Sequence, residues 1–520
     1  MTNHDLDDHH VPGTVYLIDV AGTPGSSPHD ATRSDIVLVP QPSSDPEDPL
    51  NWSSRRKLLA VSMAYLYVFG TGIATSLQYS VLADITADTG ISTTNLVQGT
   101  GVMFLFFGWA CLIWQPIALT YGRRGVYLIT MFLTVPMMLW TAYSSSAGEW
   151  FAHRILIGII VSPIESLCEV TVFDLYFAHN RGTYMGIYVF VLFGSNFLAP
   201  LVAGWFNDAY GWRWTMHFGA IICAFCFVIM FFLMEETIYF RDTATEGEVV
   251  EDLHNQQKGK NDTSEKPKEE ESDAVANLSP STSTAVLSPA PRNRGWKRYS
   301  LFTVLPRRPS NLETLRMVYR PIIMIFRFPT VAWAGFLYGI NLAWYNVLNG
   351  TASPVLTGAP YNWSAALVGC VYAGPIIGAA IASLWSGNAA DWIALQLARR
   401  NNGIREPEHR LWVLAVSGIM SAAGLITWGV GAYYDVHWVG LVFGLVSIML
   451  IRNTIGFAIS YGITPWWTTQ GLQKCFITAA MVSVVCTFTF LFFILYGKRI
   501  RRWSIPAYKE YIETAVVSQE

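Results

Sequence analysis

The chain has 520 residues, of which 52% are hydrophobic and 14% are charged, and its net charge is −3. Ordinary soluble proteins carry about 25% charged residues, so this composition argues against a set of soluble domains. The slightly acidic balance argues against nucleic acid as a partner, because nucleic-acid binders usually carry a basic excess. Cys223 and Cys226 form a C-x-x-C pair inside an apolar run, which indicates helix packing rather than a metal or redox site.

The charged residues are concentrated in polar segments at the ends and in the middle of the chain. Residues 1–56 are polar and proline-rich, with no secretory signal pattern, and we predict a cytoplasmic tail. Residues 241–320 have low complexity and cannot bury enough apolar surface to fold alone, so we predict a disordered cytoplasmic linker. Residues 504–520 form a second predicted cytoplasmic tail.

Apolar runs close to the ~20 residues that span a bilayer as a helix fill the remaining sequence. Six precede the linker, at 58–80, 97–119, 125–143, 150–172, 184–205 and 216–234. Five follow it, at 329–350, 365–385, 411–432, 438–467 and 475–497. Every backbone polar group must be satisfied within the chain in lipid, so these runs predict helices. We therefore predict an all-α polytopic membrane protein, with a six-helix bundle at 57–240 and a second helix bundle at 321–503.

Lysine and arginine occur in alternate loops, which fixes the predicted orientation. In these loops they are Arg55, Arg56, Lys57, Arg123, Arg124, Arg181, Arg399, Arg400, Arg405, Arg410, Lys498, Arg499, Arg501 and Arg502. Of the intervening loops, only 206–215 carries a basic residue, Arg213. Because basic loops stay on the cytoplasmic side, both termini and the linker are predicted to be cytoplasmic. Five helices after the linker would place the C-terminus outside, whereas the basic residues after the last run predict a cytoplasmic C-terminus. The conflict lies in the run 438–467, which Arg452 and Asn453 interrupt near its middle.

Several short motifs together resemble those of the major facilitator superfamily of secondary transporters. Two are loops, from Gln115 to Arg124 and from Gly387 to Asp391. Two lie within helical runs: Arg154 with Gly158 in the fourth, and Gly194, Pro200 and Gly204 in the fifth. A further group resembles one fungal branch close to the drug:proton antiporters: Asp48, Asn51, Trp52, Trp212, Trp214, Glu236 and Thr237. Leu119 stands where the family's first gating loop usually carries Asp.

The resemblance implies a twelve-helix transporter that works by alternating access around a midplane site. It assigns gating roles to Arg123, Arg124, Gly387 and Asp391, an antiporter-like motif to Gly194, Pro200 and Gly204, and a coupling role to Arg154. It also implies that this chain is shortened in the region of helices 10 and 11, as a shortened isoform, a mispredicted splice product or a natural deletion. The sequence has no P-loop, so we expect a proton gradient as the energy source, with no cofactor and no metal.

The fourth run carries the strongest candidates for the transport pathway. Arg154, Gly158, Glu165 and Glu169 fall within about 60° of one helical face, and Pro163 can open the backbone between them. We predict that this face lines the central cavity, with Glu165 as a proton carrier or counter-charge and Arg154 as its switchable partner. The alternative is static pairing that only holds helices together, and Glu169 could be solvated.

Other polar residues suggest further contacts. Asn341 and Tyr345 share a face of the seventh run and suit a bulky amphipathic or cationic substrate. Asp174 with its neighbouring basic residues indicates a salt bridge between the halves. Asn196 and Gln78 indicate interhelical hydrogen bonds.

The predicted function is secondary transport of a small organic molecule, with proton-coupled efflux of drugs, toxins or metabolites as the main hypothesis. The alternatives are import of a small cationic metabolite such as a polyamine, and a non-transporting sensor or inactive truncated isoform. A membrane-embedded enzyme would need a cluster of catalytic groups that the helices do not show. We expect a monomer in the lipid bilayer, with the plasma membrane as the favoured location and the substrate and protons as partners.

Overall fold

The computed structural model describes residues 15–16, 42–43, 45–177, 180–239, 300–302, 310–358, 361–384, 390–400, 404–405, 411–412, 414–415, 418–419, 422–423, 425, 472–504 and 506. Across them the chain is built of helices. Two strands of two residues, β1 (Val15–Tyr16) and β2 (Ile404–Arg405), pair antiparallel. The all-α prediction is confirmed.

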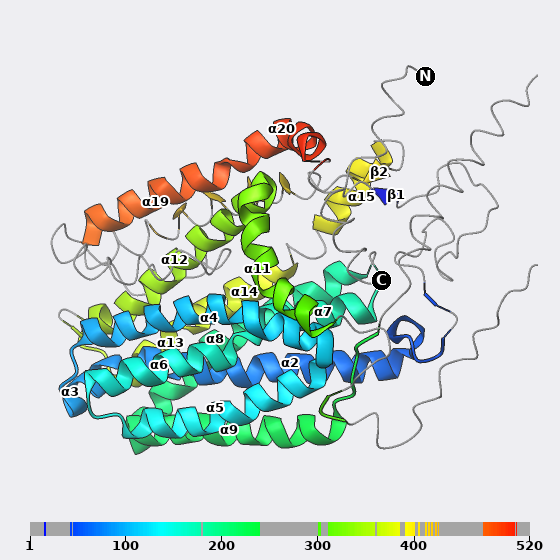
Figure 1. Ribbon diagram of the computed structural model, residues 1–520. Helices are drawn as coiled ribbons and strands as arrows, with labels where there is room; N and C mark the ends of the chain where they lie inside the picture. Colours follow the sequence, from blue (N-terminus) through cyan, green and yellow to red (C-terminus); the bar gives the residue numbers. More distant parts are fainter. Residues whose placement is uncertain are drawn as a thin grey trace, which may run out of the picture.

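The first bundle consists of long helices that lie side by side (Figure 1). Its elements are η2 (Pro49–Asn51), α2 (Ser54–Ser76), η3 (Leu77–Ser80), α3 (Leu82–Thr89), α4 (Thr93–Tyr121), α5 (Arg123–Tyr143), α6 (Ala147–Val161), α7 (Pro163–Leu175), α8 (Arg181–Tyr210) and α9 (Trp212–Leu233). Since α6 and α7 together form one span, six of the eight candidate membrane spans in the described residues belong to this part. The predicted multi-pass membrane protein is confirmed.

Single glycines make the sharp turns between consecutive spans. Gly122 separates α4 from α5 with φ +114°, and Gly211 separates α8 from α9 with φ +83°. These values lie in a region that side chains disfavour, so glycine lets the chain reverse within one residue. The short turns bring neighbouring helices together at their ends.

The described part of the second half contains α11 (Asn311–Arg327), α12 (Pro329–Thr357), α13 (Ala365–Val371), α14 (Ala373–Leu384), α15 (Ala390–Arg400), α19 (Leu472–Phe488) and α20 (Phe490–Trp503). Two candidate spans lie here, Ala365–Ala382 and Ile477–Ile500. The 29-residue helix α12 is not among the spans found in the described residues. Asn341 and Asn346 lower its apolar content. The predicted run 438–467, with its parity conflict, lies outside the described residues.

Helix α11 corrects the predicted extent of the linker. We predicted disorder up to residue 320, but a helix begins at Asn311. Ser310 accepts a hydrogen bond from the Glu313 backbone, and the Glu313 carboxylate accepts one from the Ser310 backbone. This reciprocal capping box starts a helix at the last residues of an otherwise low-complexity segment.

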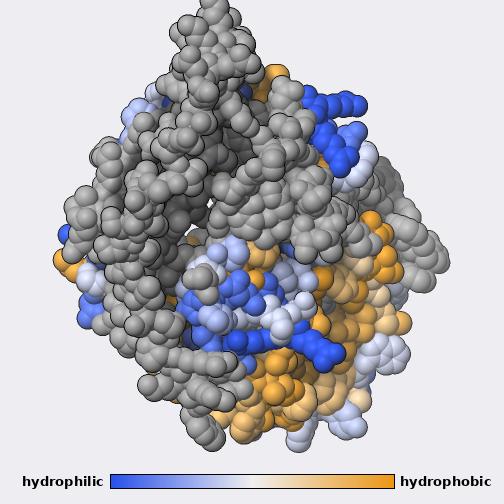
Figure 2. All heavy atoms as spheres, turned by 90° about the vertical axis from the view of Figure 1, so that its right-hand side faces the viewer, coloured by the Kyte–Doolittle hydropathy of each residue, from blue (hydrophilic) through white to orange (hydrophobic). Residues whose placement is uncertain are grey.

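One end of the first bundle, which we call the basic end, carries the arginines that begin α2, α5 and α8. Arg56 pairs with Glu235 at 2.7 Å and lies over the Trp52 ring at 3.7 Å, which joins the start of α2 to the segment after α9. Figure 2 views the molecule from this side, with hydrophilic residues gathered on the bundle end and hydrophobic residues on its flank. This distribution fits a helix end at the membrane surface.

At the opposite end, carboxylates of α3 hold the α8–α9 turn. The Asp88 carboxylate accepts a hydrogen bond from the Trp212 indole at 2.9 Å and pairs with Arg213. The Trp212 hydrogen bond, and then Arg213, lower the pKa of Asp88. Asp84 accepts a hydrogen bond from Asn207 at 2.8 Å. Arg56 and Arg123 therefore lie at one end of the first bundle, and Arg213 lies at the other, paired with Asp88.

Candidate functional site

The fourth span is interrupted at Ser162, where α6 ends and α7 begins with Pro163. Proline has no N–H, so the carbonyl of Ile159, four residues earlier, loses its helical donor. The Trp114 indole of α4 donates to that carbonyl at 2.8 Å. The expected local opening at Pro163 is confirmed, and a side chain from α4 satisfies the freed carbonyl.

Cys111 of α4 makes a second contact at the same interruption. Its thiol donates to the Ser162 carbonyl at 3.2 Å, and the Ser162 hydroxyl donates to the sulfur at 3.0 Å. Polar atoms thus hold the interruption against α4, three residues before Glu165.

Glu165 and Glu169 lie in α7, and both are half-buried. Their carboxylates lie within electrostatic range of the Cys111 thiol, so both are on the side of α7 that meets α4. The Tyr188 hydroxyl donates to the Glu165 backbone carbonyl at 3.1 Å. Among the described residues, no hydrogen bond or ion pair engages the Glu169 side chain.

Arg154 does not pair with Glu165, contrary to our expectation. Eleven helical residues correspond to about 16 Å along the axis, more than the two side chains can bridge. The guanidinium instead lies over the Trp150 ring at 4.4 Å, and one terminal nitrogen contacts the Met103 sulfur at 3.7 Å. No carboxylate of the described residues lies within 4.0 Å of it, although it is only 2% exposed.

Gly158 explains why this arginine is close to α4. A Cβ at this position would lie 2.4 Å from the Met103 carbonyl oxygen, so the absent side chain lets α6 touch the α4 backbone. Gly99 plays the same part on α4, since a Cβ there would lie 2.5 Å from Trp150. The predicted stripe therefore faces α4 inside the first bundle.

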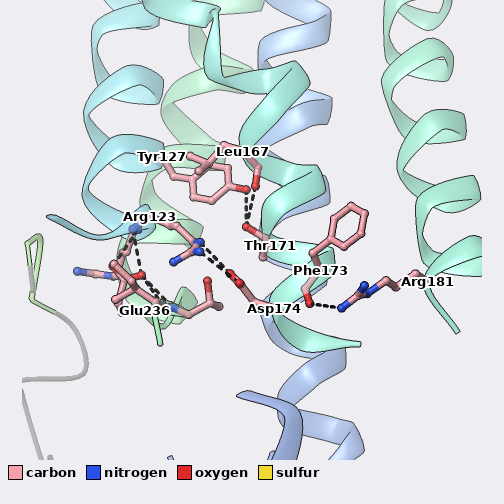
Figure 3. Close-up of polar contacts among 11 residues, drawn as sticks. Arg123, Tyr127, Leu167, Thr171, Phe173, Asp174, Arg181 and Glu236 are labelled. Carbon is pink, nitrogen blue, oxygen red and sulfur yellow. Dashed lines mark hydrogen bonds and ion pairs between the residues drawn. The ribbon is translucent and has the colours of Figure 1, made fainter. Parts of the chain in front are cut away.

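Acidic residues and carbonyls of the first bundle hold Arg123 and Arg124, which the family resemblance assigns to a gating loop. Figure 3 shows the contacts of Arg123. Arg123 makes a two-atom contact with Asp174 of α7, at 2.8 and 3.2 Å. Glu236 accepts hydrogen bonds from the Arg123 and Arg124 backbones at 3.0 and 3.1 Å, which caps the start of α5.

The described salt bridge of Asp174 thus lies within the first bundle, whereas we had predicted one between the halves. Arg124 donates to the carbonyls of Met234 and Phe231, the C-terminal carbonyls of α9. Sequence reasoning found the arginines but named no acidic partner for them, because Leu119 stands where the family's loop usually carries Asp. Glu236 and Asp174 supply the acids from other helices, and only the packing of α5, α7 and α9 reveals this.

The antiporter-like motif in α8 lies at a close crossing with the second half. A Cβ on Gly204 would lie 2.2 Å from the Ala365 carbonyl oxygen, and a Cβ on Gly369 would lie 2.8 Å from the Pro200 carbonyl oxygen. Backbone of α8 therefore touches backbone of α13. Gly194 differs, because a Cβ there would meet nothing within 4 Å.

The remaining predicted site residues are placed less completely. Asn341 and Tyr345 lie in the middle of α12, and Asp391 lies in the first turn of α15. Gly387 lies outside the described residues. Asn196 makes the predicted interhelical hydrogen bond, with Ser76 of α2, whereas the Gln78 amide donates to the nearby Thr75 carbonyl at 2.7 Å.

Known proteins are similar to this chain in sequence and in fold. The family model of the Major Facilitator Superfamily matches residues 64–469. An uncharacterized MFS-type transporter of Schizosaccharomyces pombe is 29% identical, over 96% of this chain and 94% of its own length. Protein HOL1 of Saccharomyces cerevisiae is 26% identical, over 97% of each chain, and the MFS antiporter QDR3 of Candida albicans is 24% identical, over 82% of this chain and 71% of its own length.

A solved structure, that of the human organic anion transporter MFSD10, is similar with a TM-score of 0.50 and 13% identity, covering 84% of this chain and 99% of its own. The alignment with the S. pombe relative runs over 555 positions, more than the 520 residues of this chain, so that relative has residues without a counterpart here. The family and the S. pombe relative are transporters and not enzymes. With a family model that covers most of its length and a matching helical fold, the chain belongs to the major facilitator superfamily.

Proposed function

We propose that this membrane transporter exports small organic molecules in exchange for protons, with Glu165 and Glu169 as the groups that carry the proton. The secondary transport of small molecules follows from the family. The proton coupling, the direction and the residues are our proposal.

The position of Glu169 carries this proposal. Its side chain is half-buried in a spanning helix and has no ion pair among the described residues. An ionised carboxylate is costly in such a place, and protonation removes the cost. A cationic substrate would remove it equally well, so proton and substrate can compensate the same charge in turn.

The arrangement of the basic residues supports the same scheme. Arg154 lies on Trp150, and Arg181 donates to the carbonyls of Tyr176 and Phe173, so the arginines nearest in sequence are engaged elsewhere. The relative QDR3, an antiporter by name, supports exchange as the mode of transport. Import of a small cationic metabolite such as a polyamine would use the same carboxylates and differs in direction.

The test uses the purified full-length chain in liposomes with an imposed pH gradient and two probes, ethidium for export and spermidine for import. We expect ethidium to move against the proton flux. In Glu165→Gln and Glu169→Gln the gradient-driven movement should fall to that of protein-free liposomes, because an amide can neither release a proton nor balance the charge of a cationic probe.

Glu149→Gln is the matched control, since Glu149 begins the same span but is bound to Ser145 at the opposite end of the bundle. Gradient-driven movement that persists in both Glu165→Gln and Glu169→Gln would contradict the proposed proton carriers. Gradient-driven uptake of spermidine without ethidium movement would replace export by import.

We also propose the plasma membrane as the location, with both termini cytoplasmic, and a monomer as the working unit. The basic end of the first bundle, with Arg56, Arg123, Arg124 and Arg181, supports the orientation.

A further inference from the structure

Helix α11, which joins the linker to the second half, presents an apolar stripe to the outside of the protein. Leu312, Leu315, Tyr319, Ile323 and Phe326 follow each other at intervals of three and four residues and are 60, 65, 48, 49 and 86% exposed, in that order. At 100° per residue they cover about 80° of the helix surface. So regular a stripe needs an apolar neighbour, and each of these side chains leaves about half or more of its surface exposed.

Arginines follow one edge of this stripe. Arg316, Arg320 and Arg327 lie about 20–60° from its nearest edge on the same helical projection. Arg316 and Arg327 are exposed, and Arg320 is half-buried. An apolar face bordered by cationic side chains is typical of a helix that lies in the headgroup region of a membrane.

The inner face of α11 fixes the helix at the right level for such a contact. The hydroxyls of Thr314 and Thr120 form a hydrogen bond at 3.0 Å, and the Tyr121 hydroxyl donates to the Asn311 amide oxygen at 3.0 Å. The start of α11 is therefore attached to the last residues of α4. Its other end leads through Phe328 into α12. Figure 1 shows α11 running across the direction of the long helices, as a helix parallel to the membrane plane would.

We propose that α11 binds anionic phospholipids of the leaflet at the basic end, with its apolar stripe among the acyl chains and Arg316, Arg320 and Arg327 at the headgroups. The helix is then a lipid-contacting brace between the end of α4 and the first helix of the second half. This inference concerns the membrane surface and does not rest on the proposed proton coupling. Each arginine close to an anionic surface contributes about 1 kcal/mol, or roughly a five-fold preference for an anionic headgroup.

The experiment places the full-length chain in phosphatidylcholine nanodiscs that contain a trace of photoactivatable phospholipid with either a serine or a choline headgroup. Labelling of Leu312–Phe326 is measured by mass spectrometry relative to Val331 and Phe336 of α12, which are 40 and 47% exposed. We expect the stripe to be labelled by both lipids, and more strongly by phosphatidylserine.

The variant R316Q/R327Q should lower the phosphatidylserine preference by about five-fold for each arginine removed. The matched control R399Q/R400Q removes the same charge from the exposed last turn of α15 and should leave the labelling of α11 unchanged. Thermal unfolding of both variants is measured to check that they are folded.

Three results would overturn the proposal. A stripe that stays unlabelled in the unmutated chain, while Val331 and Phe336 are labelled, removes the membrane contact without relying on any variant. Equal labelling by both headgroups removes the anionic preference. Cross-links from the stripe to a second copy of the chain would identify a protein partner in place of lipid.

Discussion

At the scale of single residues, the interrupted fourth span shows how a proline leaves a carbonyl without its helical hydrogen-bond donor, and how a side chain from another helix replaces that donor. Pro163 deprives the Ile159 carbonyl of its helical donor, and the Trp114 indole replaces it at 2.8 Å. A buried carbonyl without a partner costs about 1–3 kcal/mol. The position of Trp114 on α4 is thus tied to the proline on the neighbouring span.

This pairing predicts a coupling that a double-mutant cycle measures. Trp114→Phe should lower the free energy of unfolding in mixed detergent micelles by about 1–3 kcal/mol, because Ile159 loses its donor. In a Pro163→Ala background the alanine N–H can bond to Ile159, so the same substitution should cost clearly less. Trp214→Phe, at an exposed indole, is the control for the loss of ring area. Equal costs in both backgrounds would show that the Trp114 hydrogen bond does not compensate for the donor that Pro163 removes.

At the scale of elements, the crossing of α8 with α13 joins the two halves through backbone contact. Gly204 and Gly369 allow it, since a Cβ on either would lie within 3.0 Å of a carbonyl oxygen of the facing helix. Close approach through small residues is how helices associate where lipid offers no hydrophobic driving force. Gly194, ten residues earlier in α8, has no such neighbour.

Two matched substitutions separate close packing from a general need for glycine. Gly204→Ala should push α8 and α13 apart, lower the thermal unfolding temperature and reduce transport, because backbone oxygens cannot move aside as a flexible side chain can. Gly194→Ala should be tolerated or slightly stabilising, since alanine favours a helix by about 1 kcal/mol over glycine. Transport and unfolding measured on both variants decide the matter, and equal behaviour of the two would contradict the role assigned to the crossing.

At the scale of the whole molecule, the distribution of basic residues predicts the orientation in the membrane. Arg56, Arg123 and Arg181 all lie at one end of the first bundle, and the described contacts between α2, α5, α7 and the segment after α9 bring them together. The last described helix, α20, ends in a basic segment as well. The positive-inside pattern therefore requires an even number of crossings in the second half.

A topology reporter tests this requirement. Green fluorescent protein fused after Glu520 should fluoresce, because it matures on the cytoplasmic side, and a glycosylation tag at the same place should remain unmodified. The same pair of reporters fused before residue 1 is the control for the first half. A glycosylated C-terminal tag would mean an odd number of crossings and a basic tail outside the cytoplasm.

The sequence by itself determined the class of the molecule. Long apolar runs can satisfy their backbone in lipid only as helices, and alternating basic loops assign their ends to two sides, so the six spans before the linker and the all-α architecture follow from local pattern. Pro163 also predicted the interruption of the fourth span. The start of α11 at Asn311 was missed, because low complexity upstream hid the Ser310–Glu313 capping box.

Only the tertiary structure decided which charges meet. The helical projection placed Arg154 and Glu165 on one face, but their separation along the axis keeps them apart, and Arg154 lies on Trp150. The salt bridge of Asp174 with Arg123 of α5 likewise could not be read from the sequence. Partners on different helices depend on how those helices pack, which no local pattern contains. For that reason, periodicity and charge along the chain predict spans and sides, whereas pairings across the bundle come from the fold.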